Sequence, residues 1–167
     1  MVSFGLQEDG VSLIELMVTI TILSILVLAG TSLTGLWSKQ AELDKATMSL
    51  KSAMSLSRSI AIRNQFAKNM NDTASQMCFD ATNKEITVHK ATATATGSAS
   101  CGSPIVFSYP LSPTIDIKNT NNTNFNCFAF NNFGRIMSDN AGNCINNVAL
   151  TISNGSLNER RFNRRDG

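Results

Sequence analysis

The chain has 167 residues, of which 43% are hydrophobic and 16% charged, and its formal net charge is +2. The length suffices for one domain plus an appendage, and the apolar fraction is ordinary for a folded protein. So small an excess of basic residues does not by itself imply a nucleic-acid partner.

The apolar residues are concentrated near the N-terminus. Residues 1–10, MVSFGLQEDG, lack the basic start of a secretory signal, and no small-residue cleavage site follows the apolar segment. Residues 16–38 contain no charged side chain over 23 positions. A helix of that length spans roughly 34 Å, enough to cross the hydrocarbon core of a bilayer. We therefore predict that residues 11–38 form a membrane anchor, with Glu15 near its start.

Residues 39–66 keep the helical period but become amphipathic. Apolar and small residues recur at steps of three and four, at Leu43, Ala46, Leu50, Ala53, Met54, Ser57, Ile60 and Ala61. Charged residues fall on the other faces, namely Lys39, Glu42, Lys45, Lys51 and Arg58. No proline interrupts residues 11–66, so we predict one helix of about 50 to 55 residues. Gly30 and Gly35 are its weak points, where it can bend or let a neighbouring helix come close.

Residues 67–167 are rich in Asn, Thr, Ser and Gly and contain short alternating runs typical of strands. The predicted strands are 76–80, 85–90, 105–109, 114–118, 125–130, 134–138 and 148–153. The first two flank the turn sequence ATNK and predict a hairpin, whereas residues 91–100 read as a loop. Alternation places Ile86 and Val88 on one face and predicts that His89 is a surface residue. The expected fold class is α+β, with the helix packed on an antiparallel β-sheet domain.

Four cysteines, Cys78, Cys101, Cys127 and Cys144, all follow the apolar segment. None forms a C-x-x-C pair and His89 is the only histidine, so a zinc site is not expected. An even number of cysteines in an exported domain favours two disulfides, the alternative being four buried free thiols in a reducing compartment. Four cysteines allow three pairings, and proximity along the chain favours Cys78–Cys101 and Cys127–Cys144.

The run Gly10-Val11-Ser12-Leu13-Ile14-Glu15-Leu16, with the apolar residues after it, resembles the class III signal of type IV pilins and pseudopilins. The resemblance implies that a prepilin peptidase cuts after Gly10 and that Val11, where phenylalanine is usual, is methylated on its new amine. It also implies that Glu15 pairs with the N-terminal amine of a neighbouring subunit. Residues four apart on one helix can also meet, so an intramolecular pair with Val11 is the alternative.

The sequence LKSAMSLSRSIAIRNQ at 50–65, with Arg58, Ala61 and Arg63, is similar to the helix end of FimT- and FimU-like minor pilins and of the H-type pseudopilin of type II secretion. FNNFGRI at 130–136 and VALTIS at 148–153 resemble later segments of the same proteins. The resemblance implies a minor pilin that helps initiate assembly at or near a pilus tip, or alternatively a minor pseudopilin of a type II secretion system. Its expected partners are other pilin or pseudopilin subunits, the prepilin peptidase and the bacterial inner membrane.

With this resemblance, the chain is expected to divide into four parts. The expected parts are a leader peptide at 1–10, a transmembrane half of the helix at 11–38, an amphipathic half at 39–66 and a periplasmic β-rich domain at 67–167. A single membrane pass would leave the C-terminal domain in the periplasm before the subunit enters a pilus or pseudopilus.

The C-terminal tail, NERRFNRRDG, carries Arg160, Arg161, Arg164 and Arg165. Because arginine suits phosphate through its bidentate fork, this tail is a candidate DNA contact in DNA uptake, the alternative being a solvated terminal strand or a frayed end. No nucleophile motif or paired-carboxylate arrangement appears, and His89 has no identifiable partner for general-base work. We therefore expect no enzyme activity, no cofactor and no metal site.

Overall fold

The structure is a computed structural model that describes residues 11–94, 97–139, 143–155 and 157–162. The chain divides into two compact units, one ending at Ser38 and the other beginning at Lys39. A single helix, α1 (Leu13–Arg63), supplies the first unit from Leu13 onward and begins the second.

Helix α1 is uninterrupted over 51 residues, including Gly30 and Gly35. It ends three residues earlier than predicted. Asn64 adopts a left-handed backbone conformation, with a φ angle of 40°, while its N–H still donates to the Ile60 carbonyl. Asparagine tolerates this conformation better than most residues and commonly ends helices in this way. The Asn64 side chain continues the cap, since its Oδ1 accepts from the Lys68 N–H and its Nδ2 donates to the Lys68 carbonyl.

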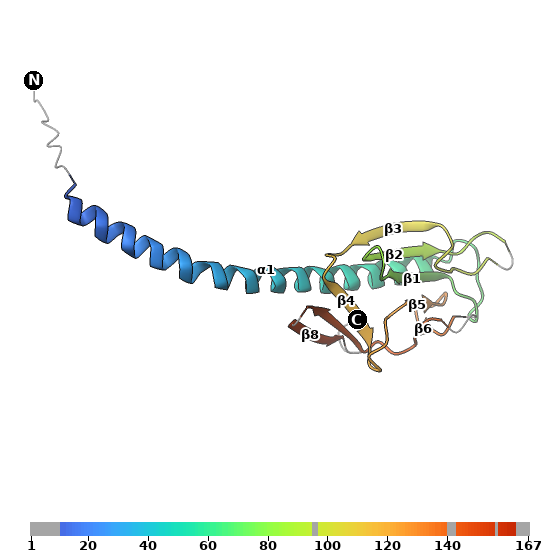
Figure 1. Cartoon of the computed structure of the whole chain (residues 1–167). Helices are drawn as coiled ribbons and strands as arrows, with labels where there is room; N and C mark the ends of the chain where they lie inside the picture. The colour runs from blue at the N-terminus through green and yellow to red at the C-terminus, as the bar shows by residue number, and fades with distance from the viewer. Residues whose placement is uncertain (1–10, 95–96, 140–142, 156, 163–167) are drawn as a thin grey trace, which may run out of the picture. The chain divides into compact units, whose positions relative to one another are not determined.

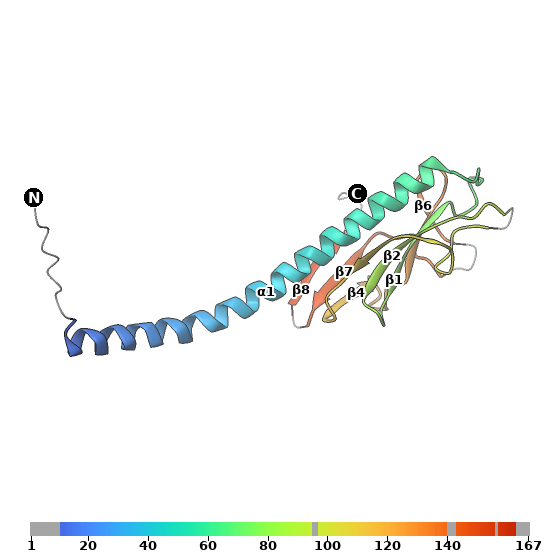
Figure 2. The same cartoon turned by 90° about the horizontal axis from the view of Figure 1, so that it is seen from above.

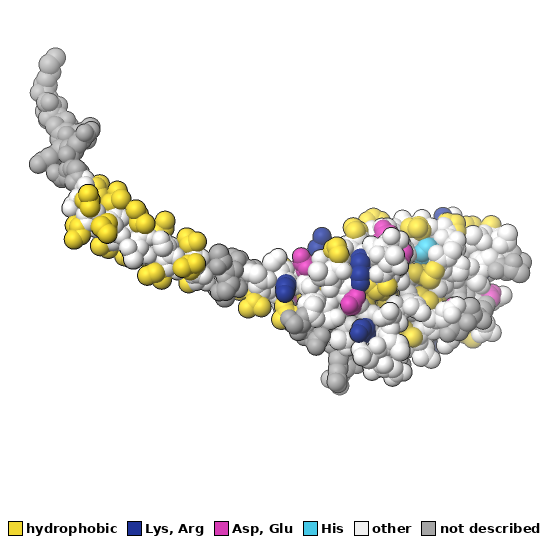
Figure 3. Space-filling view, viewed as in Figure 1, with side chains coloured by type: hydrophobic (Ala, Val, Ile, Leu, Met, Phe, Trp, Pro, Cys, Tyr) yellow, Lys and Arg dark blue, Asp and Glu magenta, His cyan; other side chains and the backbone are white. Residues whose placement is uncertain are grey.

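In the first unit, the apolar side chains of α1 are exposed within the chain itself, as the hydrophobic colouring of Figure 3 shows. α1 is the one helix of the described residues that is long and apolar enough to cross a membrane. Three of its hydroxyl groups have partners within the helix: Thr19, Thr21 and Ser24 donate to the carbonyls of Leu16, Met17 and Ile20, respectively. The helix therefore presents apolar groups and satisfied hydroxyls to its surroundings, which suits a lipid environment.

The second unit contains two antiparallel sheets, which confirms the predicted α+β class. The five-stranded sheet has the order β3-β2-β1-β5-β6, and the three-stranded sheet has the order β4-β7-β8. The strands are β1 (Ser75–Asp80), β2 (Glu85–Lys90), β3 (Ile105–Pro110), β4 (Ile115–Asn119), β5 (Cys127–Phe130), β6 (Ile136–Met137), β7 (Leu150–Asn154) and β8 (Leu157–Phe162). Figures 1 and 2 show both sheets beside the second half of α1.

One face of α1 forms the core with both sheets. Of the eight positions predicted for this face, all are buried except Ile60, which is partly buried against the core. The alanines on this face let the strands approach closely, and the Ser75 hydroxyl of β1 donates to the Ser57 carbonyl of α1 at 2.6 Å. Phe125 and Phe128 pack with ring centroids 4.8 Å apart and ring planes tilted by 49°, and they are among the largest buried side chains. The amphipathic pattern thus becomes a helix–sheet core.

The face of the five-stranded sheet opposite α1, here called the outer face, is also covered. Disulfides join Cys78 of β1 to Cys101 and Cys127 of β5 to Cys144, and Cys78 and Cys127 lie directly opposite each other in the sheet. The Gln76 amide nitrogen lies 3.4 Å from Cys101 Sγ and 2.9 Å from Cys144 Sγ. The two bonds therefore hold two loops against the outer face.

His89 also lies on this face, and the prediction that it is a surface residue was wrong. Its side chain is 2% exposed. Nδ1 lies 2.7 Å from the Ser103 carbonyl, and Nε2 lies 2.8 Å from the Thr87 hydroxyl. Alternation assigns the second face of a strand to solvent only when nothing covers it, and here the loop carrying Cys101 does so.

Glu42 joins α1 to loops and strands of the second unit. Its Oε2 accepts hydrogen bonds from Asn154 Nδ2 at 2.9 Å, Ser112 Oγ at 3.1 Å and Thr114 Oγ1 at 3.2 Å. The Asn154 amide, which is 1% exposed, also donates to the Lys39 carbonyl. These bonds favour the ionised form, and the one from Asn154 contributes most to lowering the pKa of Glu42.

Because the folded-state pKa of Glu42 is lowered, its contribution to stability is present above the unfolded-state pKa and is lost as pH falls through the folded-state value. We expect Glu42→Gln to lower the denaturation midpoint at pH 7 and to lower it less at pH 3. Denaturant titrations of the detergent-solubilised chain at the two pH values, followed by circular dichroism, measure this. The other carboxyl groups titrate alike in the parent and the variant, so their effects cancel in the difference between the two midpoints. An equal difference at pH 7 and pH 3 would contradict a stabilising role of the ionised Glu42.

Candidate functional site

The start of α1 is organised by Ser12 and Glu15. Leu13 is the first helical residue, so Ser12 occupies the N-cap position and Glu15 is the third residue of the helix. The Glu15 carboxylate accepts a hydrogen bond from the Ser12 backbone N–H at 3.1 Å. The Leu16 N–H donates to the Ser12 carbonyl at 3.2 Å. Glu15 therefore satisfies one of the backbone donors that a helix start leaves free, as in one half of a capping box.

The sequence reasoning missed this contact, although the signal was present. Ser12-x-x-Glu15 is the spacing of a capping box, in which the acidic residue reaches back to the N-cap amide. A carboxylate in the first turn also interacts favourably with the helix dipole. Glu15 thus has a local role in the single chain, besides the intermolecular one implied by the resemblance.

The surroundings of Glu15 are apolar and open. Val11 is 73% exposed and Leu13 and Ile14 are similarly exposed, so no part of the described chain covers them. Among the described residues no Lys or Arg forms an ion pair with Glu15. One carboxylate oxygen holds the Ser12 amide, and the other has no protein partner in that same part of the chain.

The structure does not gather the other predicted site residues around Glu15. Gly10 lies outside the described residues. The four cysteines form two disulfides in the second unit, in the pairing that proximity along the chain favoured. Arg160 and Arg161 belong to β8, where Arg161 pairs with Thr151 of β7, whereas Arg164 and Arg165 lie outside the described residues. DNA contact by this tail stays a prediction from the sequence.

Cys127, Asp139 and Cys144 come close enough to suggest a metal cluster, with ligand atoms within 4.8 Å of one another. Both sulfurs are joined in a disulfide, however, and a metal needs thiolates. Asp139 is also occupied, because its Oδ1 accepts from the Cys144 N–H at 2.9 Å. This cluster is part of the disulfide-linked loop.

Comparison with known proteins gives one match. The family model described as the prokaryotic N-terminal methylation motif matches residues 7–31, which contain the predicted cleavage position, Glu15 and most of the apolar run. No curated protein and no solved structure gives a significant match. Together with the long N-terminal helix and the antiparallel sheets that follow it, the motif fits a type IV pilin-like protein.

Proposed function

We propose that this protein is a minor pilin, a structural subunit that helps initiate assembly at or near the tip of a type IV pilus. In this proposal a prepilin peptidase removes residues 1–10, methylates Val11 and leaves residues 11–38 as the inner-membrane anchor. Residues 39–66 and 67–167 form the periplasmic part. Glu15 then pairs with the N-terminal amine of a neighbouring subunit.

The position of Glu15 carries the proposal. It is the only ionisable residue of α1 before Lys39, and its surroundings are apolar and exposed. A carboxylate at membrane depth is costly unless a cation or several hydrogen bonds compensate it. Cleavage after Gly10 would create such a cation at Val11. Since only one oxygen holds the Ser12 amide, the second can accept the amine of a neighbour without loss of the helix cap.

The similarity of residues 50–65 and 130–136 to minor pilins and to the H-type pseudopilin supports a minor subunit. A pseudopilus of type II secretion is the alternative machine, because it would use the same anchor and the same Glu15 contact. Co-purification from the native host distinguishes the two, since pilus-tip subunits would accompany the chain in one case and secretion components in the other.

Processing provides the direct test. We expect the chain purified from host membranes to begin at Val11 and to carry the mass of one additional methyl group, as measured by intact-mass and N-terminal peptide spectrometry. The matched control is Gly10→Leu, which should retain the full leader because the proposed cut follows Gly10. A mature chain that still begins at Met1, in cells with an active prepilin peptidase, would contradict the proposal.

A further inference from the structure

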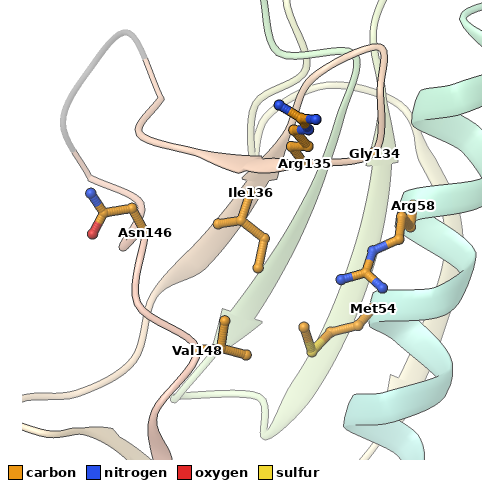
Figure 4. A pocket seen from close by; sticks show the side chains of 7 residues that line it. All are labelled: Met54, Arg58, Gly134, Arg135, Ile136, Asn146 and Val148. Atoms are coloured by element: carbon orange, nitrogen blue, oxygen red, sulfur yellow. The ribbon is translucent and has the colours of Figure 1, made fainter. Parts of the chain in front are cut away.

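A cavity of about 490 Å³ lies in the second unit, between α1 and the segment that leads into β6. Figure 4 shows its lining side chains. Met54 and Arg58 come from α1, Ile136 comes from β6, and Val148 comes from the segment before β7. We call it the Arg58 pocket.

The guanidinium of Arg58 points from α1 into this pocket (Figure 4). Its Nε atom is buried and has no hydrogen-bond partner among the described residues. Buried donors are nearly always paired, so this nitrogen is available to donate to an acceptor that enters the pocket.

Gly134 places the neighbouring turn against the stem of Arg58. Its φ angle is +70°, and a Cβ atom added there would lie 2.7 Å from Arg58 Cγ. Only glycine accommodates both the left-handed backbone and this close approach. The turn also brings Arg135 to the edge of the pocket, where its side chain is exposed and points away from Arg58 (Figure 4). Two arginines from distant parts of the chain are thus positioned at one cavity.

The lining defines the chemistry of a ligand. Besides Arg58 and Arg135 it includes the Asn146 amide, and none of the described residues that line the pocket is acidic. Met54, Ile136 and Val148 supply an apolar part. Arginine matches the planar geometry of a carboxylate, and the apolar part suits the methylene stem that carries one. An extended nucleic-acid backbone would instead call for a row of basic groups on an open surface.

We propose that the Arg58 pocket is a binding site for an acidic side chain of another filament subunit, whose carboxylate binds Arg58 and is attracted by the charge of Arg135 at the edge, while its methylene groups contact Met54 and Val148. Only one part of this inference rests on the proposed function, namely that the carboxylate comes from another filament subunit. The affinity of the pocket for a carboxylate is a property of the single chain.

Titration of the full-length chain in detergent micelles tests that affinity. Butyrate serves as the probe, and the signal is the Arg58 side-chain Nε–H resonance in ¹H–¹⁵N NMR spectra at constant ionic strength. We expect a saturable shift with butyrate. Butyramide should bind at least about tenfold more weakly than butyrate, because it lacks the charge. Absence of a saturable shift, or an equal response to butyramide, would overturn the proposal. Tighter binding of inorganic phosphate than of butyrate would also overturn it and would point to nucleic acid.

Two variants locate the binding. Arg58→Gln should abolish the response of backbone resonances around residue 136, and Arg135→Gln should weaken it while leaving the fold unchanged, because Arg135 is exposed. Arg63→Gln, at the exposed last residue of α1 and outside the pocket lining, is the matched control and should bind like the parent chain. If Arg58→Gln does not fold, the butyrate affinities of Arg135→Gln and Arg63→Gln are compared instead. Equal affinities of these two variants would refute the site.

The source of the carboxylate is tested in cells. A photo-crosslinking amino acid at Asn146 should form a product with a peptide of another filament subunit that contains Asp or Glu next to the crosslinked position. The product should be lost in the Arg58→Gln, Arg135→Gln double variant, while cleavage after Gly10 continues. A crosslink to a peptide without acidic residues would refute the subunit contact. If the parent chain is neither cleaved nor assembled, the proposed function fails, whereas the butyrate result still stands or falls separately.

Discussion

Replacing Glu15 with Ala is expected to leave the subunit inserted in the membrane and to reduce its incorporation into filaments about 100-fold or more. Removing one partner of a buried ion pair costs about 3–5 kcal/mol, and each 1.4 kcal/mol changes an equilibrium tenfold. Insertion should persist because residues 16–38 remain free of charge. Immunoblots of sheared filaments and of washed membranes, compared between parent and variant, measure both effects.

Glu15→Gln separates the two roles of this side chain. Glutamine can also reach back to the Ser12 N–H, since capping boxes use Glu or Gln at this position. It cannot neutralise an amine. We therefore expect Glu15→Gln to assemble nearly as poorly as Glu15→Ala. Normal assembly of the Gln variant would show that Glu15 acts through the helix cap, and the pairing with a neighbour's amine would have to be abandoned.

Removing either disulfide is expected to lower the free energy of unfolding by about 3 kcal/mol. The bonds close loops with sequence separations of 23 and 17, and the entropy of loop closure depends only weakly on such a difference. The pairs Cys78→Ser with Cys101→Ser, and Cys127→Ser with Cys144→Ser, should therefore have similar effects. Denaturant titration of the oxidised, detergent-solubilised chain measures each loss.

Without both bonds the loss approaches about 6 kcal/mol, a large part of the roughly 5–15 kcal/mol that stabilises a typical domain. We expect the fourfold Ser variant to expose the outer face and to become sensitive to protease between residues 91 and 104. Ser100→Ala, in the same loop but outside the disulfide, is the control and should remain resistant. Unchanged denaturation midpoints in both double variants would mean that packing alone holds the loops.

Hydrophobic periodicity predicted the helix and the approximate positions of most strands. Leu43, Leu50 and Ala53 are buried where a period of 3.6 places them, because the helix packs on the sheets through one face. The helix end was missed because it depends on the left-handed conformation of Asn64. The sequence offered a terminal strand in the C-terminal tail only as an alternative, because its polar residues show no alternation, and β8 is in fact paired with β7.

The sites differ in how far the sequence could reveal them. Glu15 is conspicuous because a charge stands beside a long apolar run. The Arg58 pocket was hidden because α1, the turn at Gly134 and Asn146 meet only after folding. The helical period placed Arg58 on a face with charged residues. It could not show that the turn at Gly134 covers the stem of this side chain. Positions that depend on a loop from elsewhere in the chain are not encoded in local periodicity.

The hydroxyls of Thr19, Thr21 and Ser24 bear on how such a subunit can change environment. Because each donates within the helix, none has to exchange a partner when the segment moves from lipid to an array of packed helices. At these three positions the transfer would leave the hydrogen bonds unchanged, whereas at Glu15 it would alter a polar interaction. Thr19, Thr21 and Ser24 therefore add no cost of broken hydrogen bonds to a transfer in either direction.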